Sequence, residues 1–139
     1  MPAILEYHWI VSADEIDGLG HVNNVAYVKR MQDAAVAHSA AQGWDTTRYV
    51  AEGAAFVAKS HFIEYHKPAQ LGDVIVVLTW VSEFGKATSR RKYRMERMGD
   101  ATLLATAETV WAYVSRETGL PKRIPPELLQ EFETSPGPE

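Results

Sequence analysis

The residues with the clearest chemical potential lie in one short segment, residues 17–27, with the sequence DGLGHVNNVAY. The segment opens on a carboxylate, Asp17, in a turn with two glycines, and it runs into a stretch with helical spacing. The first turn of a helix has unpaired backbone N–H groups and a partial positive charge, which together stabilise an oxyanion. Asp17 is therefore a candidate nucleophile or general base for an acyl carbonyl held at the helix start.

Neighbours of Asp17 have candidate roles in the same reaction. Backbone amides near Asn23 and Asn24 are placed to polarise the carbonyl oxygen, and His21 is a candidate to orient the acyl group or relay a proton, because an imidazole can both donate and accept one. The same residue types also have a structural explanation, because Asp in a glycine-rich turn and Asn before a helix are ordinary turn and capping chemistry. Residue types alone leave both interpretations open.

Strands and a helix must together position these residues. Residues 5–13 have strand composition, and helical spacing then runs from about Asn24 to Gln42, with Asn23 or Asn24 as N-cap and Gly43 after the last turn. The pattern predicts four further strands at residues 54–66, 73–82, 87–97 and 102–115, and a short helix at residues 126–132. Short turns separate the last three strands, which should therefore be antiparallel neighbours.

One long helix and five strands predict an α+β fold in a single domain, residues 1–132, followed by a flexible tail, residues 133–139. The helix cannot bury its apolar face alone, so we expect an antiparallel sheet to curve around it. The strands contain nearly continuous apolar runs that need cover on both faces. One helix covers only one face, so a second subunit is expected to pack against the sheet.

The segment from Asp17 to Tyr27 resembles the signature of hot-dog-fold thioesterases, the group that includes 4-hydroxybenzoyl-CoA thioesterase. That family has an Asp, two intervening residues, a Gly, and a Tyr later in the helix, here Asp17, Gly20 and Tyr27. The HVNN sequence also resembles the plant acyl-carrier-protein thioesterases. Two further matches follow in the family's order and spacing, the Y-x-K-P-A-x-x-G-D run of residues 65–73 and the TGLP and IP sequences within residues 118–125.

The resemblance implies a hot-dog fold, with a five-stranded antiparallel sheet wrapped around one long central helix. It also implies a homodimer, or a homotetramer formed as a dimer of dimers, with active sites between subunits. Asp17 would be the catalytic carboxylate, the Asn24 amide the oxyanion donor, and Asn23 and Tyr27 neighbours of the substrate. No metal or bound cofactor is expected, and coenzyme A enters as part of the substrate. Leu19 departs from the acyl-carrier-protein enzymes, which have Asn there.

A basic run, RRKYR at residues 90–94, is the second chemical feature. On a strand, Arg90 and Arg94 share one face while Arg91 points to the other. Coenzyme A carries a 3′-phosphate and a pyrophosphate, and arginine binds such groups through paired hydrogen bonds. We expect Arg90 or Arg91 to contact a phosphate of the substrate. The alternative is a solvated strand face that Glu96 partly neutralises.

Composition argues against several other functions. The net charge of −4 is unlike that of a nucleic-acid binder, and the chain has no cysteine for a disulfide, a thiolate zinc site or a nucleophile. The five histidines lack metal-ligand spacing. The first ten residues do not resemble a signal peptide, and no stretch has the roughly 20 apolar residues that span a bilayer. We expect a cytoplasmic protein with no nucleic-acid or membrane partner.

The predicted function is hydrolysis of an acyl-CoA thioester to the free acid and CoA. Three alternatives stay open: an acyl-carrier-protein thioesterase, an acyl-CoA hydratase or dehydratase that uses Asp17 and His21 as a dyad, and a non-catalytic acyl-CoA-binding protein. The sequence does not specify the acyl group, nor whether Asp17 attacks the carbonyl itself or activates water. It also leaves open whether His21 is catalytic or only orients the substrate.

Overall fold

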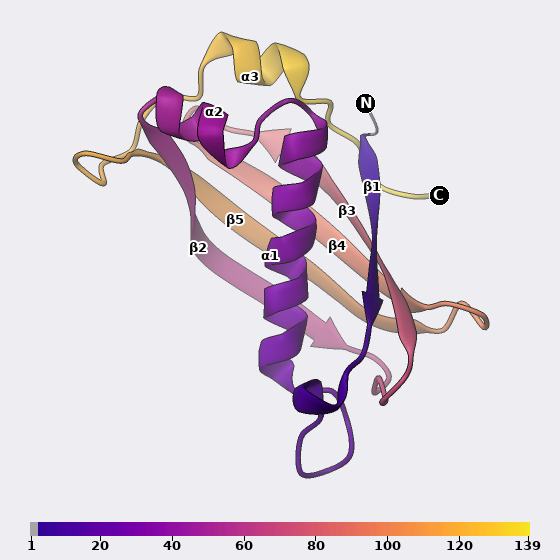
Figure 1. Ribbon diagram of the computed structural model, residues 1–139. Coiled ribbons are helices and arrows are strands. Elements are labelled where there is room, and N and C mark those ends of the chain that lie inside the picture. Colours follow the sequence, from indigo (N-terminus) through magenta and orange to yellow (C-terminus); the bar gives the residue numbers. More distant parts are fainter. Residues whose placement is uncertain (1–2) are drawn as a thin grey trace.

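A five-stranded antiparallel sheet carries one long helix across one of its faces in the computed structural model, which describes residues 3–139 (Figure 1). The strands are β1 (Ile4–Ile10), β2 (Ala54–Tyr65), β3 (Val74–Phe84), β4 (Thr88–Arg97) and β5 (Leu103–Ser115), in the spatial order β1-β3-β4-β5-β2. The helices are α1 (Asn24–Ala41), α2 (Thr46–Ala51) and α3 (Pro126–Glu131), with a 3-10 turn at Ala13–Glu15. The α+β class, the single sheet and the antiparallel hairpins β3–β4 and β4–β5 confirm the expectations from sequence. Within residues 3–139, no helix is both long and apolar enough to cross a bilayer.

Helix α1 is fixed by caps at its two ends and by a buried face that combines alanines with three larger side chains. The Asn23 side chain accepts a hydrogen bond from the Ala26 amide at 2.9 Å, so Asn23, not Asn24, is the N-cap. At the other end Gly43 adopts a φ of 92°, a conformation that glycine enters without strain. The buried face of the helix packs against β1 and β3 and consists of Ala26, Tyr27, Met31, Ala34, Ala35 and His38.

The core has two clusters, one towards each end of α1. The first surrounds Trp9, Tyr27 and Met31, beside the amino-terminal half of the helix. The second contains Trp44, Tyr113 and Phe132. It lies at the other end of the helix, where α2 and α3 cover that end of the sheet (Figure 1).

Two local expectations were wrong. Strand β1 ends at Ile10, not Ala13, because Ser12 and Glu15 form a reciprocal capping box that closes the 3-10 turn. The six-residue helix α2 was not predicted. Its N-cap is Asp45, whose side chain accepts a hydrogen bond from the Arg48 amide at 2.9 Å.

The two edges of the sheet differ. Along β1 and β3 the carboxyl-terminal segment lies close by, since the Ser135 amide donates to the Val81 carbonyl at 3.0 Å. Flexibility of residues 133–139 stays a prediction. The β2 edge is open, and most of this strand beyond Phe56 is exposed, including Val57, Phe62 and Tyr65.

Candidate active site

A hydrogen-bonded turn fixes the Asp17 carboxylate at the protein surface. Its Oδ1 accepts from the amides of Leu19 at 2.8 Å and His21 at 3.2 Å, and the Asp17 amide donates to the His21 carbonyl at 2.7 Å. Gly20 turns the chain with a φ of 80°. No donor from residues 3–139 meets Oδ2, so one oxygen of this exposed carboxylate stays available to a ligand or water.

The start of α1 presents unpaired donors immediately after this turn. The Asn23 amide donates to the Glu15 carbonyl at 2.8 Å, and the Ala26 amide is capped by Asn23. The amides of Asn24 and Val25 find no acceptor in the described part of the chain. Two adjacent N–H groups at the positive end of an 18-residue helix form a suitable site for an oxyanion.

The second sequence match packs directly against the first. The Val22 amide donates to the Ala69 carbonyl at 2.9 Å, which ties the turn to the KPA segment after β2. The Tyr65 ring lies 5.0 Å from the Tyr27 ring, at 75° to it. Residues far apart in the sequence therefore build one surface at the start of α1.

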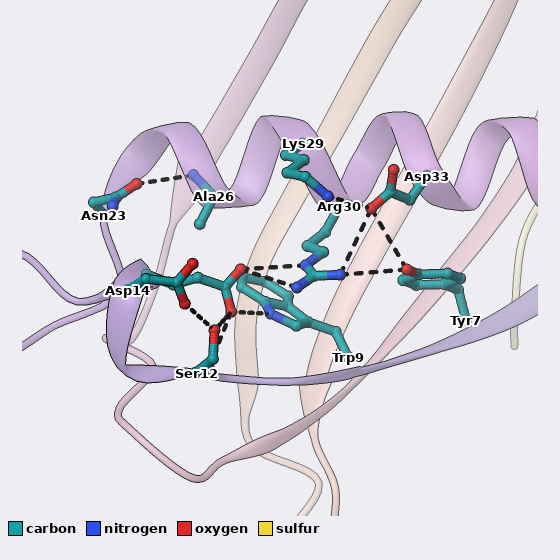
Figure 2. Close-up of polar contacts among 10 residues, drawn as sticks. Tyr7, Trp9, Ser12, Asp14, Asn23, Ala26, Lys29, Arg30 and Asp33 are labelled. Atoms are coloured by element: carbon teal, nitrogen blue, oxygen red, sulfur yellow. Dashed lines mark hydrogen bonds and ion pairs between the residues drawn. The ribbon is translucent and has the colours of Figure 1, made fainter.

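A buried carboxylate, Glu15, fastens this surface to the sheet, and the sequence analysis did not identify it. Glu15 Oε1 accepts from Trp9 Nε1 and from the Ser12 amide, both at 3.0 Å. Its Oε2 pairs with Arg30 of α1 at 3.2 Å, and Figure 2 shows Arg30 above Trp9 and Ser12. Burial by itself raises the pKa of Glu15, but hydrogen bonds from Ser12 and Trp9 and the charge of Arg30 lower it below its usual value overall. The only sequence signal was the S-x-x-E spacing of Ser12 and Glu15.

The other predicted site residues near Asp17 are held by contacts within the fold. His21 is half-buried and hydrogen-bonds through its main chain, and the Asn23 side chain is used as the helix cap. Tyr27 is buried one turn into the helix between Trp9 and Tyr65, and burial raises the pKa of its hydroxyl. No side chain within residues 3–139 hydrogen-bonds to the Asp17 carboxylate.

Arg90 and Arg91 lie elsewhere, on opposite faces of β4. Arg90 points away from α1 and pairs with Glu83 at 3.0 Å and Glu108 at 2.6 Å. Arg91 points inward and is buried, with Nη1 2.9 Å from His38 Nδ1 near the carboxyl end of α1. The alternation of the two side chains confirms the expected strand geometry. Within one chain, however, Arg91 lies towards the opposite end of the helix from Asp17.

A family model described as the thioesterase-like superfamily matches residues 11–132, which includes the turn, α1 and the whole sheet except β1. The chain belongs to this superfamily. It is 36% identical over 70 residues to a chloroplastic acyl-(acyl-carrier-protein) hydrolase of Cuphea viscosissima, and 36% identical over 62 residues to an Arabidopsis thaliana palmitoyl-acyl carrier protein thioesterase. Those matches cover 50% and 45% of this chain but only 17% and 15% of the two plant proteins.

Solved structures establish the hot-dog fold. Slr0204, a 1,4-dihydroxy-2-naphthoyl-CoA thioesterase from Synechocystis, superposes with a TM-score of 0.84 at 18% identity, over 93% of this chain and 95% of that chain. SAV2348 from Staphylococcus aureus, crystallised in complex with CoA, superposes with a TM-score of 0.88 at 15% identity, over 98% and 88% of the two chains. The fold implied by the sequence resemblance is confirmed.

Proposed function

We propose that this thioesterase-like protein hydrolyses an acyl-CoA thioester to the free acid and CoA, at a site formed by Asp17 and the start of α1. One observation carries the proposal. The Asp17 carboxylate, with one oxygen free, lies in the turn that leads into α1, and the first two amides of that helix, Asn24 and Val25, are unpaired. Acyl transfer needs a nucleophile or base beside an oxyanion site. The match to the thioesterase-like superfamily favours a thioester as the substrate.

The chemistry can follow two routes. As a general base, Asp17 takes a proton from water, and the resulting hydroxide adds to the thioester carbonyl. The Asn24 amide holds the oxyanion, which then expels CoA thiolate, and the thiolate takes up the proton. As a nucleophile, Asp17 itself adds to the carbonyl and expels the thiolate, and water then hydrolyses the mixed anhydride. Both routes use one water and yield one acid and one thiol.

We assign CoA, rather than acyl carrier protein, as the thiol carrier of the substrate. The Staphylococcus aureus protein SAV2348 was crystallised with CoA, whereas the plant relatives are named for acyl-carrier-protein substrates. In this proposal the Arg90 guanidinium binds a CoA phosphate. The phosphate would replace Glu83 or Glu108 in the exposed ion pairs of Arg90. Asn23, Tyr27 and His21 are assigned to the walls of the site.

We also propose that the working unit is a homodimer, or a tetramer of two such dimers, joined along the β2 edges. A 12-residue edge strand with unpaired backbone groups invites pairing with another chain. Phe62 is 63% exposed and Val57 45% exposed, so pairing would also cover apolar surface. A cytoplasmic location remains the expectation from the sequence.

The test is thiol release from a panel of acyl-CoAs, from short to long and aromatic, with the matching acyl-carrier-protein thioesters in parallel. The proposal expects turnover of at least one acyl-CoA with stoichiometric thiol and acid. Turnover confined to carrier-protein substrates would show that the thiol carrier is acyl carrier protein and not CoA. Hydration or dehydration of the acyl chain without thiol release would make the protein a hydratase or dehydratase. Binding without any reaction would make it a sensor.

A further inference from the structure

A cavity of about 190 Å³ lies at the end of the fold opposite to Asp17. Its walls come from the last turns of α1, from α2 and from the adjoining ends of β2–β5, next to α3 (Figure 1). Since an α-helix rises about 1.5 Å per residue, Ser39 on its wall lies roughly 20 Å along the helix from Asn24. Aromatic side chains, including Trp44, Phe56 and Phe132, make up much of the surface.

The cavity contains a buried positive charge with no carboxylate beside it. Arg91 lines the cavity and is 4% exposed. Its Nη1 is 2.9 Å from His38 Nδ1 and donates to Thr79 Oγ1 at 3.1 Å, and neither partner carries a negative charge. No carboxylate within residues 3–139 forms an ion pair with Arg91. Burial lowers the pKa of its guanidinium. A buried charge without a counter-ion is costly, so an anion that enters this cavity would be stabilised by Arg91.

A second group in the same wall also lacks its partner. Trp44 is fully buried and lines the cavity, and its indole N–H has no acceptor in the described part of the chain. Buried donors are almost always satisfied in native proteins. The Trp44 nitrogen itself is enclosed, so a ligand would meet the face of its ring. The donors for a ligand come from the Arg91 guanidinium, which uses only Nη1 on His38 and Thr79 and can pair with an anionic group that brings several acceptor lone pairs. Arg116 at the wall adds a further positive charge.

We infer that this cavity is a binding site for a small amphipathic carboxylate, with its carboxylate held by Arg91 and its apolar body against Trp44, Phe56 and Phe132. A carboxylate fits better than a phosphate ester or a nucleotide, because the rest of the wall offers little hydrogen bonding. The volume is below the roughly 300 Å³ at which sites for drug-sized ligands begin, so the ligand is a medium-chain or single-ring acid. The inference goes beyond the proposed hydrolysis and does not depend on it.

Calorimetric titration of the full chain at pH 7.5 tests the inference, with octanoate and benzoate as probes and their neutral amides, octanamide and benzamide, as controls. At least one acid should bind tenfold or more tightly than its amide, because only the acid supplies the missing charge. Arg91→Met should remove that difference and leave amide binding unchanged. Arg94→Met makes the same change on the outer face of β4 and should preserve it.

Wild-type protein supplies a second readout if the Arg91 variant does not fold. In ¹H–¹⁵N spectra the Trp44 indole resonance, assigned with Trp44→Phe, should shift on addition of the acid and not of the amide. Asp17→Asn should bind the acid as wild type does, which separates this site from the proposed active site. Equal affinity for acid and amide, retained discrimination in Arg91→Met, or an indole resonance that does not respond would overturn the inference.

Discussion

Glu15→Gln tests whether one buried carboxylate holds the start of α1 in place. Oε1 accepts from Trp9 and Ser12 at 3.0 Å, and Oε2 pairs with Arg30 at 3.2 Å. A glutamine amide has one acceptor oxygen and one NH₂ donor, so in either orientation the NH₂ faces other donors. Breaking a buried ion pair costs about 3–5 kcal/mol, and Arg30 keeps 22% of its side chain exposed, so we expect a loss of about 3 kcal/mol.

Urea unfolding at pH 7, followed by tryptophan fluorescence, measures this loss as a change in midpoint at constant slope. Glu117→Gln is the matched control, because it makes the same chemical change at an exposed carboxylate and should stay within about 0.5 kcal/mol of wild type. A loss below about 1 kcal/mol in Glu15→Gln would refute the reasoning, since the contacts would then contribute no more than surface contacts.

The pH dependence gives the same prediction an independent check. Because the pKa of Glu15 is lower in the folded protein than its usual 4.5, ionised Glu15 stabilises the fold above that pH. This contribution disappears as the pH falls through the lowered value. The difference between wild type and Glu15→Gln should therefore be constant above about pH 5.5 and shrink below pH 4.5. A difference that grows on acidification would have the wrong sign.

Three further predictions concern the cap, the edge strand and the basic face. Asn23→Ala removes the acceptor of the Ala26 amide and should cost about 1 kcal/mol in urea unfolding; no change would show that the cap is dispensable. Phe62→Lys should turn the proposed dimer into a monomer in light scattering, whereas Leu129→Lys, exposed on α3, should not. Arg90→Gln should raise the KM for an acyl-CoA about threefold to tenfold with kcat unchanged; an unchanged KM would remove Arg90 from the site.

Much of the fold could be predicted because local signals agreed with one another. The small-residue spacing of α1, the Asn before it and the Gly43 after it all indicated the same helix, and its start was predicted to the residue. Helix α2 was not predicted, because six residues are too few to show helical periodicity. Without that periodicity, Asp45 alone is weak evidence for a helix N-cap. The end of β1 was also predicted too late in the sequence, because it depends on the side-chain hydrogen bonds between Ser12 and Glu15.

The candidate site was predictable where it is continuous in the sequence and not where it is assembled in space. Asp17 and the helix start lie close together in the sequence, so a turn next to a helix was enough to connect them. Glu15 gains its importance from Arg30 and Trp9, which only the packing of α1 on β1 brings close. Strand alternation predicted that Arg90 and Arg91 face opposite ways, but not that the inward one lies against α1 without a carboxylate.

The most direct test of the central claim is kcat/KM for the best acyl-CoA of the panel, measured for Asp17→Asn beside Asp14→Asn. The amide side chain introduced by Asp17→Asn keeps an oxygen that can accept from Leu19 and His21, so the turn should fold and only the charge is lost. Asp14 is an exposed carboxylate in the preceding turn that carries the same charge. We predict a fall of a hundredfold or more for Asp17→Asn, about 3 kcal/mol of barrier, and less than about threefold for Asp14→Asn. Full activity in Asp17→Asn would contradict the account.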